Sequence, residues 1–486
     1  MSLWKEIKNK NIEEVKNIIN QDKSLAYSVD DNGMTTLIAS AKAGSLDLMQ
    51  YFIKLGIEPL SLTPNGSDIL TAAASVGSLE CFEYSLSLGA KIDRKREDGT
   101  TVMIFAASGG NPEIIKKCID AGLDVNERSK GLSTPLIEAA KKGSLESCKI
   151  LIENGADATL KQKNGFSALN GSCISGNYDL FMYLTTKMPL EETNKGSLVH
   201  DAVIGNNTDI VEFLINNKFD LNTKVKGRYP IHLACMKGNL KMVRLLLDNG
   251  AKLQNCDAEN TPLHYAAESD KVETFDFILS KTKDINPKNV LGMTPLLQAA
   301  AAHAFNVCKY IIAKGGDIFA LDNKNHGILH YAATHCDTGL LDTLDMLSVD
   351  FNLEDISGKT PLFSAVECGN MDVIKYFVEE KYADLKKKDN EGKNLFHNIC
   401  NNVNVCEYLL ANGVDPAEKD ENEATPLHYA AESGKIDIIP FFLSHGCKAD
   451  DKDANGMTPV DLASDFGHIE CFELLVDSVE TPEHHE

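Results

Sequence analysis

The sequence predicts an all-α solenoid, in which stacked helix-turn-helix units are joined by extended finger loops. Two glycine registers predict this fold. A glycine, or a residue in its place, begins each unit in steps of mostly 33 residues and otherwise 30 to 34. A second glycine follows the first helix of most units and moves with the first register. About fifteen units result, counting an amino-terminal cap.

The unit starts, called frame positions below, are Gly33, Gly66, Gly99, Leu132, Gly165, Lys195, Gly227, Glu259, Gly292, Asn325, Gly358, Gly392, Glu423 and Gly456. The second register comprises Gly44, Gly77, Gly110, Gly143, Gly176, Gly238, Gly369, Gly434 and Gly467.

Residues 133–157 show one complete unit. Thr134 can cap a first helix, and Pro135 suits the first helical position because its missing N–H costs nothing there. Gly143 can end this helix with a positive φ, and Ser144 can cap the second. Two helices this short cannot bury their apolar faces alone, so each unit needs neighbours on both sides.

These residues resemble the ankyrin-repeat family. The matching segments are Thr134-Pro135-Leu136, Thr261-Pro262-Leu263-His264-Tyr265-Ala266-Ala267, Thr294-Pro295-Leu296, Thr360-Pro361-Leu362, Thr425-Pro426-Leu427-His428-Tyr429-Ala430-Ala431 and Thr458-Pro459. The resemblance covers essentially the whole chain. It implies a binding scaffold but names no partner, because ankyrin arrays serve unrelated partners.

The resemblance also implies structural roles for the threonines and histidines at the start of each first helix. In the family the imidazole bonds the threonine hydroxyl and the neighbouring backbone, which links adjacent repeats. The residues expected to link repeats in this way are Thr134, Thr261, His264, Thr294, Thr360, Thr425 and His428.

The chain is expected to divide into a cap, two arrays and a tail. The predicted boundaries are 1–32 for the amino-terminal cap, 33–190 for the first array, 191–477 for the second array and 478–486 for a disordered acidic tail. Within the second array the pattern drifts near 325–350, where 339–348 is expected to make a poor second helix, and near 392–422, where the turn between the helices is short.

Composition excludes several classes of protein. The net charge of −23 opposes general binding to nucleic acid, which needs a basic surface. No run of residues approaches the roughly 18 apolar residues of a membrane helix. The amino-terminal segment lacks the apolar core of a secretory signal, so the cytoplasm is the expected location, with the cytoskeleton or a flagellum as alternatives.

No pattern predicts an enzyme, a cofactor or a metal. The sequence has no glycine-rich phosphate loop after a strand and no Cys-x-x-Cys pair. One local cluster has metal-ligating residue types, namely His326, His330, His335 and Cys336. Because Gly327 predicts a helix start between the first two histidines, a shared ligand face is not expected.

The fingers differ in charge along the chain. Counted as Lys and Arg against Asp and Glu, the first five fingers, from 91–99 to 220–228, sum to +3, and the next seven, from 252–259 to 450–456, sum to −11. A basic edge on an acidic protein can attract an acidic partner, whereas the alternative interpretation is simple solvation. The candidate partner-binding cations are Arg94, Lys95, Arg96, Arg128, Lys130, Lys161, Lys163, Lys224, Lys226 and Arg228.

The sequence therefore favours a non-catalytic scaffold that binds a protein or peptide through its finger tips and the concave face of its first helices. A structural brace in a cytoskeletal or axonemal assembly is the alternative. A regulatory subunit of an enzyme or channel ranks third. The sequence fixes neither the partner nor the oligomeric state.

Overall fold

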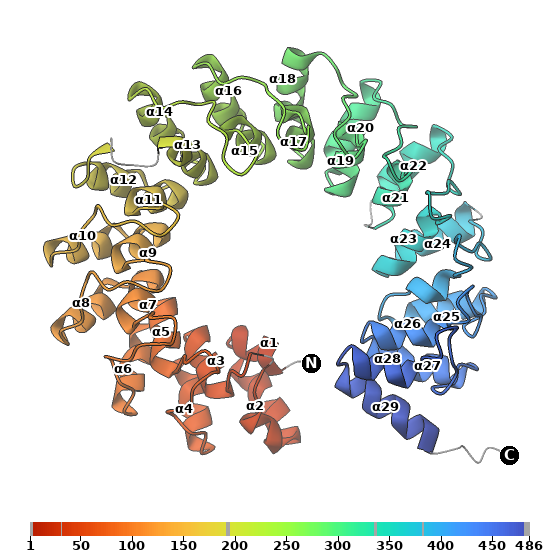
Figure 1. The fold of residues 1–486 in the computed structure, drawn as a ribbon, viewed down its shortest axis with the longest axis horizontal. Helices are drawn as coiled ribbons and strands as arrows, with labels where there is room; N and C mark the ends of the chain where they lie inside the picture. The colour runs from red at the N-terminus through yellow and green to blue at the C-terminus, as the bar shows by residue number, and fades with distance from the viewer. Residues whose placement is uncertain (1–2, 31, 191–194, 335–337, 382, 481–486) are drawn as a thin grey trace. The chain divides into compact units, whose positions relative to one another are not determined.

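A computed structural model describes residues 3–30, 32–190, 195–334, 338–381 and 383–480 of the chain. It contains 29 α-helices, arranged in successive antiparallel pairs (Figure 1). Within the described ranges there is no β-strand, only isolated bridges at some finger turns. The predicted all-α repeat fold is therefore confirmed.

The chain forms two compact units, which are described separately. Unit 1 comprises Met1–Ala234 and Lys241–Lys252, and unit 2 comprises Cys235–Leu240 and Leu253–Glu486. The predicted boundary at 190 adjoins residues 191–194, which lie outside the described part of the chain.

In unit 1 the first helices of the pairs form one row and the second helices form another (Figure 1). The first helices are α1 (Leu3–Lys8), α3 (Thr36–Ala43), α5 (Ile69–Val76), α7 (Val102–Gly109), α9 (Pro135–Lys142), α11 (Ala168–Ser175), α13 (Lys195–Ile204) and α15 (Pro230–Met236). The second helices are α2 (Ile12–Gln21), α4 (Leu46–Lys54), α6 (Leu79–Ser87), α8 (Pro112–Asp120), α10 (Leu145–Glu153), α12 (Tyr178–Thr185), α14 (Thr208–Asn216) and α16 (Leu240–Asp248), and a 3₁₀ turn, η1 (Lys23–Tyr27), follows α2.

Unit 2 repeats this arrangement. Its first helices are α17 (Pro262–Glu268), α19 (Pro295–Ala301), α21 (Ile328–Ala332), α23 (Pro361–Cys368), the 3₁₀ turn η4 (Leu395–Asn398), α26 (Pro426–Glu432) and α28 (Pro459–Asp465). The second helices are α18 (Val272–Thr282), α20 (Phe305–Ala313), α22 (Thr338–Met346), α24 (Met371–Lys375) continued by a π turn, η3 (Tyr376–Glu380), α25 (Val403–Ala411), η5 (Ile436–Ile438) continued by α27 (Ile439–Ser444), and α29 (Ile469–Glu480).

The frame positions keep one backbone conformation even where glycine is absent. Gly99 has φ 74°, and Leu132, Glu259, Asn325 and Glu423 reach φ between 56° and 62°. A side chain in this left-handed region costs roughly 1 kcal/mol, so the turn imposes the conformation and glycine is only its easiest occupant. Lys195 is the exception, because it begins α13 instead of a turn.

The core runs between successive pairs. The first helices contribute small residues, such as Ala73, Ala106 and Ala139, which have no exposed surface and allow the helices to approach closely. The second helices contribute large residues, such as Phe82 and Phe181, which are equally buried. Each pair therefore buries its apolar faces mainly against its neighbours, and stability accumulates along the array.

The structure corrects two expectations and refines a third. Residues 339–348 were expected to make a poor second helix, but α22 forms there with Leu340, Leu341 and Leu344 buried. The predicted tail starts too early, because Ser478 still belongs to α29. In the repeat at 392–422 the first helix itself is shortened to the single turn η4.

A buried carboxyl group lies between two first helices of unit 1. Asp201 of α13 accepts a hydrogen bond of 2.7 Å from the amide of Asn170 on α11, and that amide also donates to Ser197 Oγ at 2.9 Å. Burial raises the pKa of Asp201 to about 6, although the hydrogen bonds from Asn170 and Ser197 act to lower it. This group therefore titrates near neutral pH.

We expect Asp201→Asn to remove a pH-dependent loss of stability. A raised carboxyl pKa means that the folded state holds a proton that the unfolded state releases, so the contribution of Asp201 to stability is greatest below about pH 4 and is lost as pH rises through about 6. Two pKa units correspond to roughly 2–3 kcal/mol. Asn can accept the same hydrogen bond without a charge. The free energy of unfolding in urea should be higher for the variant, relative to the wild type, at pH 7.5 than at pH 5. The same difference in free energy between variant and wild type at both pH values would contradict the assignment.

Candidate functional site

Six fingers of unit 2 are closed by a side-chain oxygen three residues before the frame position, here called the finger-turn position; Cys256 occupies this position in the finger before Glu259. Asp420 is typical. Its Oδ1 accepts hydrogen bonds from the backbone N–H groups of Asn422 at 2.8 Å and Ala424 at 2.9 Å, and its Oδ2 accepts one from the Tyr429 hydroxyl at 2.7 Å. The residues that accept the same pair of backbone hydrogen bonds in unit 2 are Asn289, Asp322, Asp355, Asp389, Asp420 and Asp453.

These carboxylates belong to the framework. Burial acts to raise the pKa of Asp322, but hydrogen bonds from the Tyr331 hydroxyl and from two backbone N–H groups outweigh it, so this pKa lies below its ordinary value. The pKa of Asp355 is lowered in the same way by Ser357 and Lys359. Much of the acidic excess counted in the fingers of unit 2 therefore closes turns.

Unit 1 fills the finger-turn position differently in most repeats, although Asp30 Oδ1 accepts from Asn32 N at 3.0 Å and from Met34 N at 2.7 Å, as the unit 2 carboxylates do. The described residues there are Asp30, Thr63, Arg96, Ser129, Gln162 and Lys224. Thr63 and Ser129 each have a single hydroxyl in place of the carboxylate. Thr63 Oγ1 accepts a hydrogen bond from Ser67 N at 2.9 Å, and Ser129 Oγ accepts one from Ser133 N at 3.2 Å. Arg96 places a cation at the equivalent position, and its guanidinium lies 5.5 Å from the Phe105 ring.

Several predicted binding cations connect neighbouring fingers. Arg96 Nε donates to Asn65 O in the preceding finger at 2.8 Å, and Arg128 Nη2 donates to Lys161 O in the following finger at 2.5 Å. Lys95 pairs with Glu127 at 2.5 Å. Arg94 also lies 3.7 Å from Asp68 in the preceding repeat. These residues hold the fingers in register, a role that charge counting in the sequence did not show.

The remaining predicted cations lie on the finger surface. Lys130, Lys163 and Lys226 are exposed. The Lys224 ammonium lies 5.3 Å from the Tyr229 ring. The side chains of Lys161 and Arg228 are half-buried and exposed respectively.

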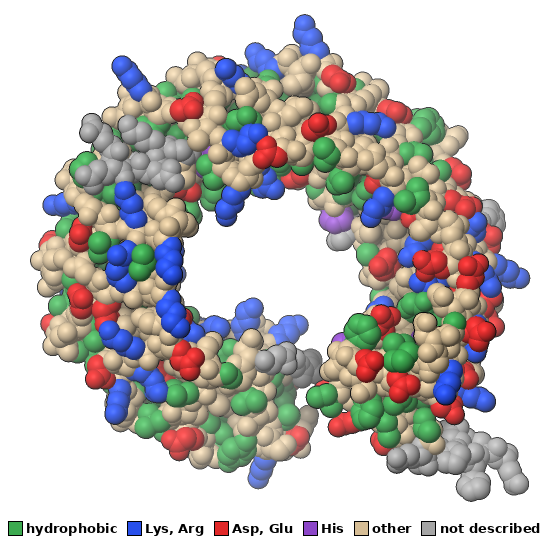
Figure 2. Space-filling model, in the orientation of Figure 1, with side chains coloured by type: hydrophobic (Ala, Val, Ile, Leu, Met, Phe, Trp, Pro, Cys, Tyr) green, Lys and Arg blue, Asp and Glu red, His purple; other side chains and the backbone are tan. Residues whose placement is uncertain are grey.

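The basic character continues onto the first helices. Figure 2 shows Lys and Arg side chains gathered along the concave edge of unit 1, over helices α3 to α9. Lys42 of α3 and Lys142 of α9 are exposed, and Lys141 of α9 lies 5.2 Å from the Phe166 ring. Sequence analysis counted only the fingers and missed these helical lysines.

The histidines at the starts of the first helices lie in separate repeats and bond the adjacent backbone. His264 Nδ1 lies 3.0 Å from Thr261 Oγ1, and its Nε2 lies 3.0 Å from Met293 O in the next repeat. His428 makes the equivalent contacts to Thr425 and to Asp451 O. Burial lowers the pKa of both histidines, so they are neutral at pH 7.

Of the other threonines expected to link repeats, two cap the first helix with the side-chain hydroxyl and one does not. Thr134 and Thr294 accept from the backbone N–H three residues later, at 3.3 Å and 3.4 Å, whereas Thr360 makes no side-chain cap hydrogen bond.

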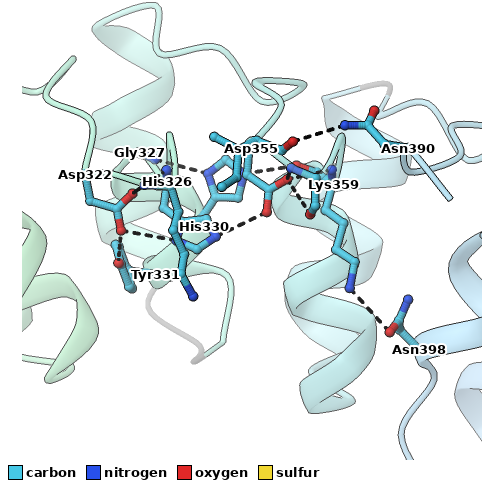
Figure 3. Close-up of polar contacts among 12 residues, drawn as sticks. Asp322, His326, Gly327, His330, Tyr331, Asp355, Lys359, Asn390 and Asn398 are labelled. Atoms are coloured by element: carbon cyan, nitrogen blue, oxygen red, sulfur yellow. Dashed lines mark hydrogen bonds and ion pairs between the residues drawn. The ribbon is translucent and has the colours of Figure 1, made fainter. Parts of the chain in front are cut away.

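The local histidine cluster is part of a finger contact (Figure 3). His326 lies between two finger-turn carboxylates, with Nδ1 3.2 Å from Asp322 Oδ2 and Nε2 3.2 Å from Asp355 Oδ2. His330 Nε2 faces Lys359 O at 3.2 Å. His335 and Cys336, the other predicted members, lie outside the described residues. In the part of the chain that the structure describes, no group of three or more His, Cys, Asp or Glu side chains is arranged to hold a metal ion.

Comparison with known families matches a model described as Ankyrin repeats (3 copies) to six overlapping windows, residues 3–96, 70–162, 136–225, 199–289, 329–420 and 396–484. Among the described residues, no helix is long and apolar enough to span a bilayer.

Several curated proteins are similar over part of their length. The human Transient receptor potential cation channel subfamily A member 1 is 24% identical over 340 residues, which cover 58% of this chain and 30% of that protein. Mouse Rabankyrin-5 is 28% identical over 37% of this chain and 17% of its own length. Alpha-latrocrustotoxin-Lt1a of Latrodectus tredecimguttatus is 32% identical over 124 residues, which cover 24% of this chain and 9% of that protein. The chain thus spans less than a third of each of these relatives.

A crystal structure of the human ASB11 ankyrin repeat domain is 25% identical, with a TM-score of 0.37, and covers 45% of this chain and 99% of that domain.

The finger-turn carboxylate should contribute more to local stability than its hydroxyl counterpart. Asp420→Ala removes two charge-assisted hydrogen bonds from the backbone and a third from the Tyr429 hydroxyl, a loss of about 3 kcal/mol. Ser129→Ala removes one neutral hydrogen bond, about 1 kcal/mol. Protection of the backbone amides against hydrogen exchange should fall roughly 100-fold in the finger of Asp420→Ala and roughly 5-fold in the finger of Ser129→Ala. Equal losses at both sites would show that the carboxylate is not special.

Proposed function

Because the chain belongs to the ankyrin-repeat family, whose repeats typically mediate protein–protein interactions, we propose that it is a non-catalytic scaffold binding an acidic protein partner through unit 1. The binding surface comprises the fingers and the concave first-helix face of that unit. The observation that supports it most is the cation at two finger-turn positions, Arg96 and Lys224, where most repeats of unit 2 have a carboxylate.

The charge contrast favours an acidic partner. The whole chain carries −23, so a general attraction for anions is not expected. A local row of exposed cations, such as Lys130, Lys163 and Lys226, can nevertheless steer an acidic segment toward unit 1. Since exposed charges are screened over about 8 Å at physiological ionic strength, association should weaken as salt is raised.

The fingers hold these cations at fixed spacing. Asn126 Nδ2 donates to Gly155 O at 2.9 Å, and its Oδ1 accepts from Asp157 N at 2.8 Å, so one finger is tied to the next. Asn222 makes the corresponding pair of contacts to Gly250 O and Lys252 N. A surface ordered before binding loses less conformational entropy when the partner docks.

The test reverses charge at three exposed fingers. The triple variant Lys130→Glu, Lys163→Glu and Lys226→Glu should lower capture of the partner from native extract at least tenfold, with the loss of cross-links to these fingers. The matched control reverses two lysines on second helices and one in the turn that follows α14, Lys54→Glu, Lys149→Glu and Lys218→Glu. Cross-linking mass spectrometry identifies the partner, and circular dichroism checks the helical content.

Equal capture by both triple variants would contradict the proposal. A captured polymer that co-sediments with the protein would instead favour the structural brace, because the same cations would then contact an assembly.

A further inference from the structure

The concave face of unit 1 is hollowed where its first three repeats meet. The hollow has a volume of about 320 Å³ and lies between α3, α5 and α7 on one side and three successive fingers on the other. Twelve residues line it, among them Met34, Ile38, Lys42, Ala72, Arg96 and Phe105. This volume is at the lower end of the roughly 300–1,000 Å³ typical of ligand pockets.

Side-chain size at one repeat position explains the hollow. The sixth residue after the frame position is Ala39 in the first repeat and Ala72 in the second, but Phe105 in the third and Glu138 in the fourth. Ala72 lines the hollow on α5, where its small side chain leaves space, and Phe105 lines it on α7.

The two cations of the hollow come from different sides, Lys42 from the helices and Arg96 from the third finger. Lys42 lies on α3, and Arg96 extends across the Phe105 ring. The Arg96 side chain is fixed by its hydrogen bond to Asn65 O at 2.8 Å and by Asp98, 3.9 Å from Nη2. None of the twelve lining residues is acidic. An anionic group in the hollow would therefore meet two cations and no lining carboxylate.

The hollow also offers apolar surface. Met34 and Phe105 line it, and Ile38 forms part of its floor with only 1% of its surface exposed. A free inorganic anion would leave this apolar surface uncovered. An acidic side chain next to a large apolar one in the same extended chain would cover both surfaces.

We propose that the hollow binds an extended peptide segment of the partner, in which a Glu or Asp side chain lies between Lys42 and Arg96 and an adjacent large apolar side chain packs on Phe105. This inference rests on the proposed function, since it specifies which part of an acidic partner is recognised. The finger cations steer the partner by charge, and the hollow selects the apolar neighbour of a carboxylate.

The test uses three fluorescein-labelled peptides and fluorescence anisotropy with the full chain. The probe GSELEGSELEGS carries Glu-Leu pairs, GSESEGSESEGS keeps the charge without leucine, and GSQLQGSQLQGS keeps leucine without charge. The probe should bind at least tenfold more tightly than either of the other two.

Two variants assign the binding to the hollow. Ala72→Phe fills it with a side chain that the next repeat already accommodates at Phe105, and Lys42→Glu reverses one of its cations. Each variant should bind the probe at least tenfold more weakly than the wild type does. Lys54→Glu, the same charge change on the second helix of the first repeat, should leave affinity within twofold, and the thermal midpoint of Ala72→Phe reports whether the fold is intact.

The outcomes separate this inference from the function on which it rests. If partner capture depends on Lys130, Lys163 and Lys226 while Ala72→Phe leaves probe affinity unchanged, the scaffold function stands and the hollow is not its pocket. If the leucine-free peptide binds as well as the probe, recognition is by charge alone and the inference is wrong. Failure of the probe to bind at millimolar concentration also overturns it.

Discussion

The turn that connects one helix pair to the next is the constraint on which the rest of the structure depends. A pair of helices with fewer than about a dozen residues each cannot stay folded alone, so each must be held against its neighbours. The turn does this with a left-handed frame residue and a side-chain oxygen that satisfies backbone N–H groups. The left-handed frame residue recurs through most of the array, whether it is Gly358 or Glu423, and the side-chain oxygen recurs in most repeats of unit 2.

The two units close this turn with different chemistry, and the difference sets their surface charge. In unit 2 carboxylates such as Asp389 and Asp420 are mostly buried and hydrogen-bonded. In unit 1 a hydroxyl stands at this position in Thr63 and Ser129 and a cation in Arg96 and Lys224, while Asp30 keeps the carboxylate. Neighbouring fingers are also connected directly, as by the hydrogen bond from Arg128 to Lys161 O.

Much of the fold could be predicted because the registers record backbone geometry. Leu132 and Asn325 could be placed at frame positions by spacing alone, and both adopt the positive φ expected of glycine there. The prediction of a poor second helix near 338–346 was wrong. Gly339 lowers the helix propensity of this segment, but the helix forms because Leu340 and Leu344 are buried against neighbouring repeats.

The candidate site could be predicted only in part from the sequence. Counting charges located the basic fingers but could not show that Asp322 and Asp420 point into their own turns. It also could not separate Arg96, which contacts Asn65 O, from Lys163, which lies on the surface. These distinctions depend on side-chain direction, which charge type does not encode. The hollow appears only when residue size is compared at one position across repeats.

The most direct test of this account is the substitution Arg96→Asp, with thermal stability and affinity for an acidic peptide measured on the same sample. The account predicts that the new carboxylate closes the finger turn as Asp420 does, so the midpoint is kept or raised while affinity falls at least tenfold. A midpoint lowered by several degrees would show that Arg96 is chiefly a structural tie. Unchanged affinity would contradict the exchange of turn stability for a basic binding surface.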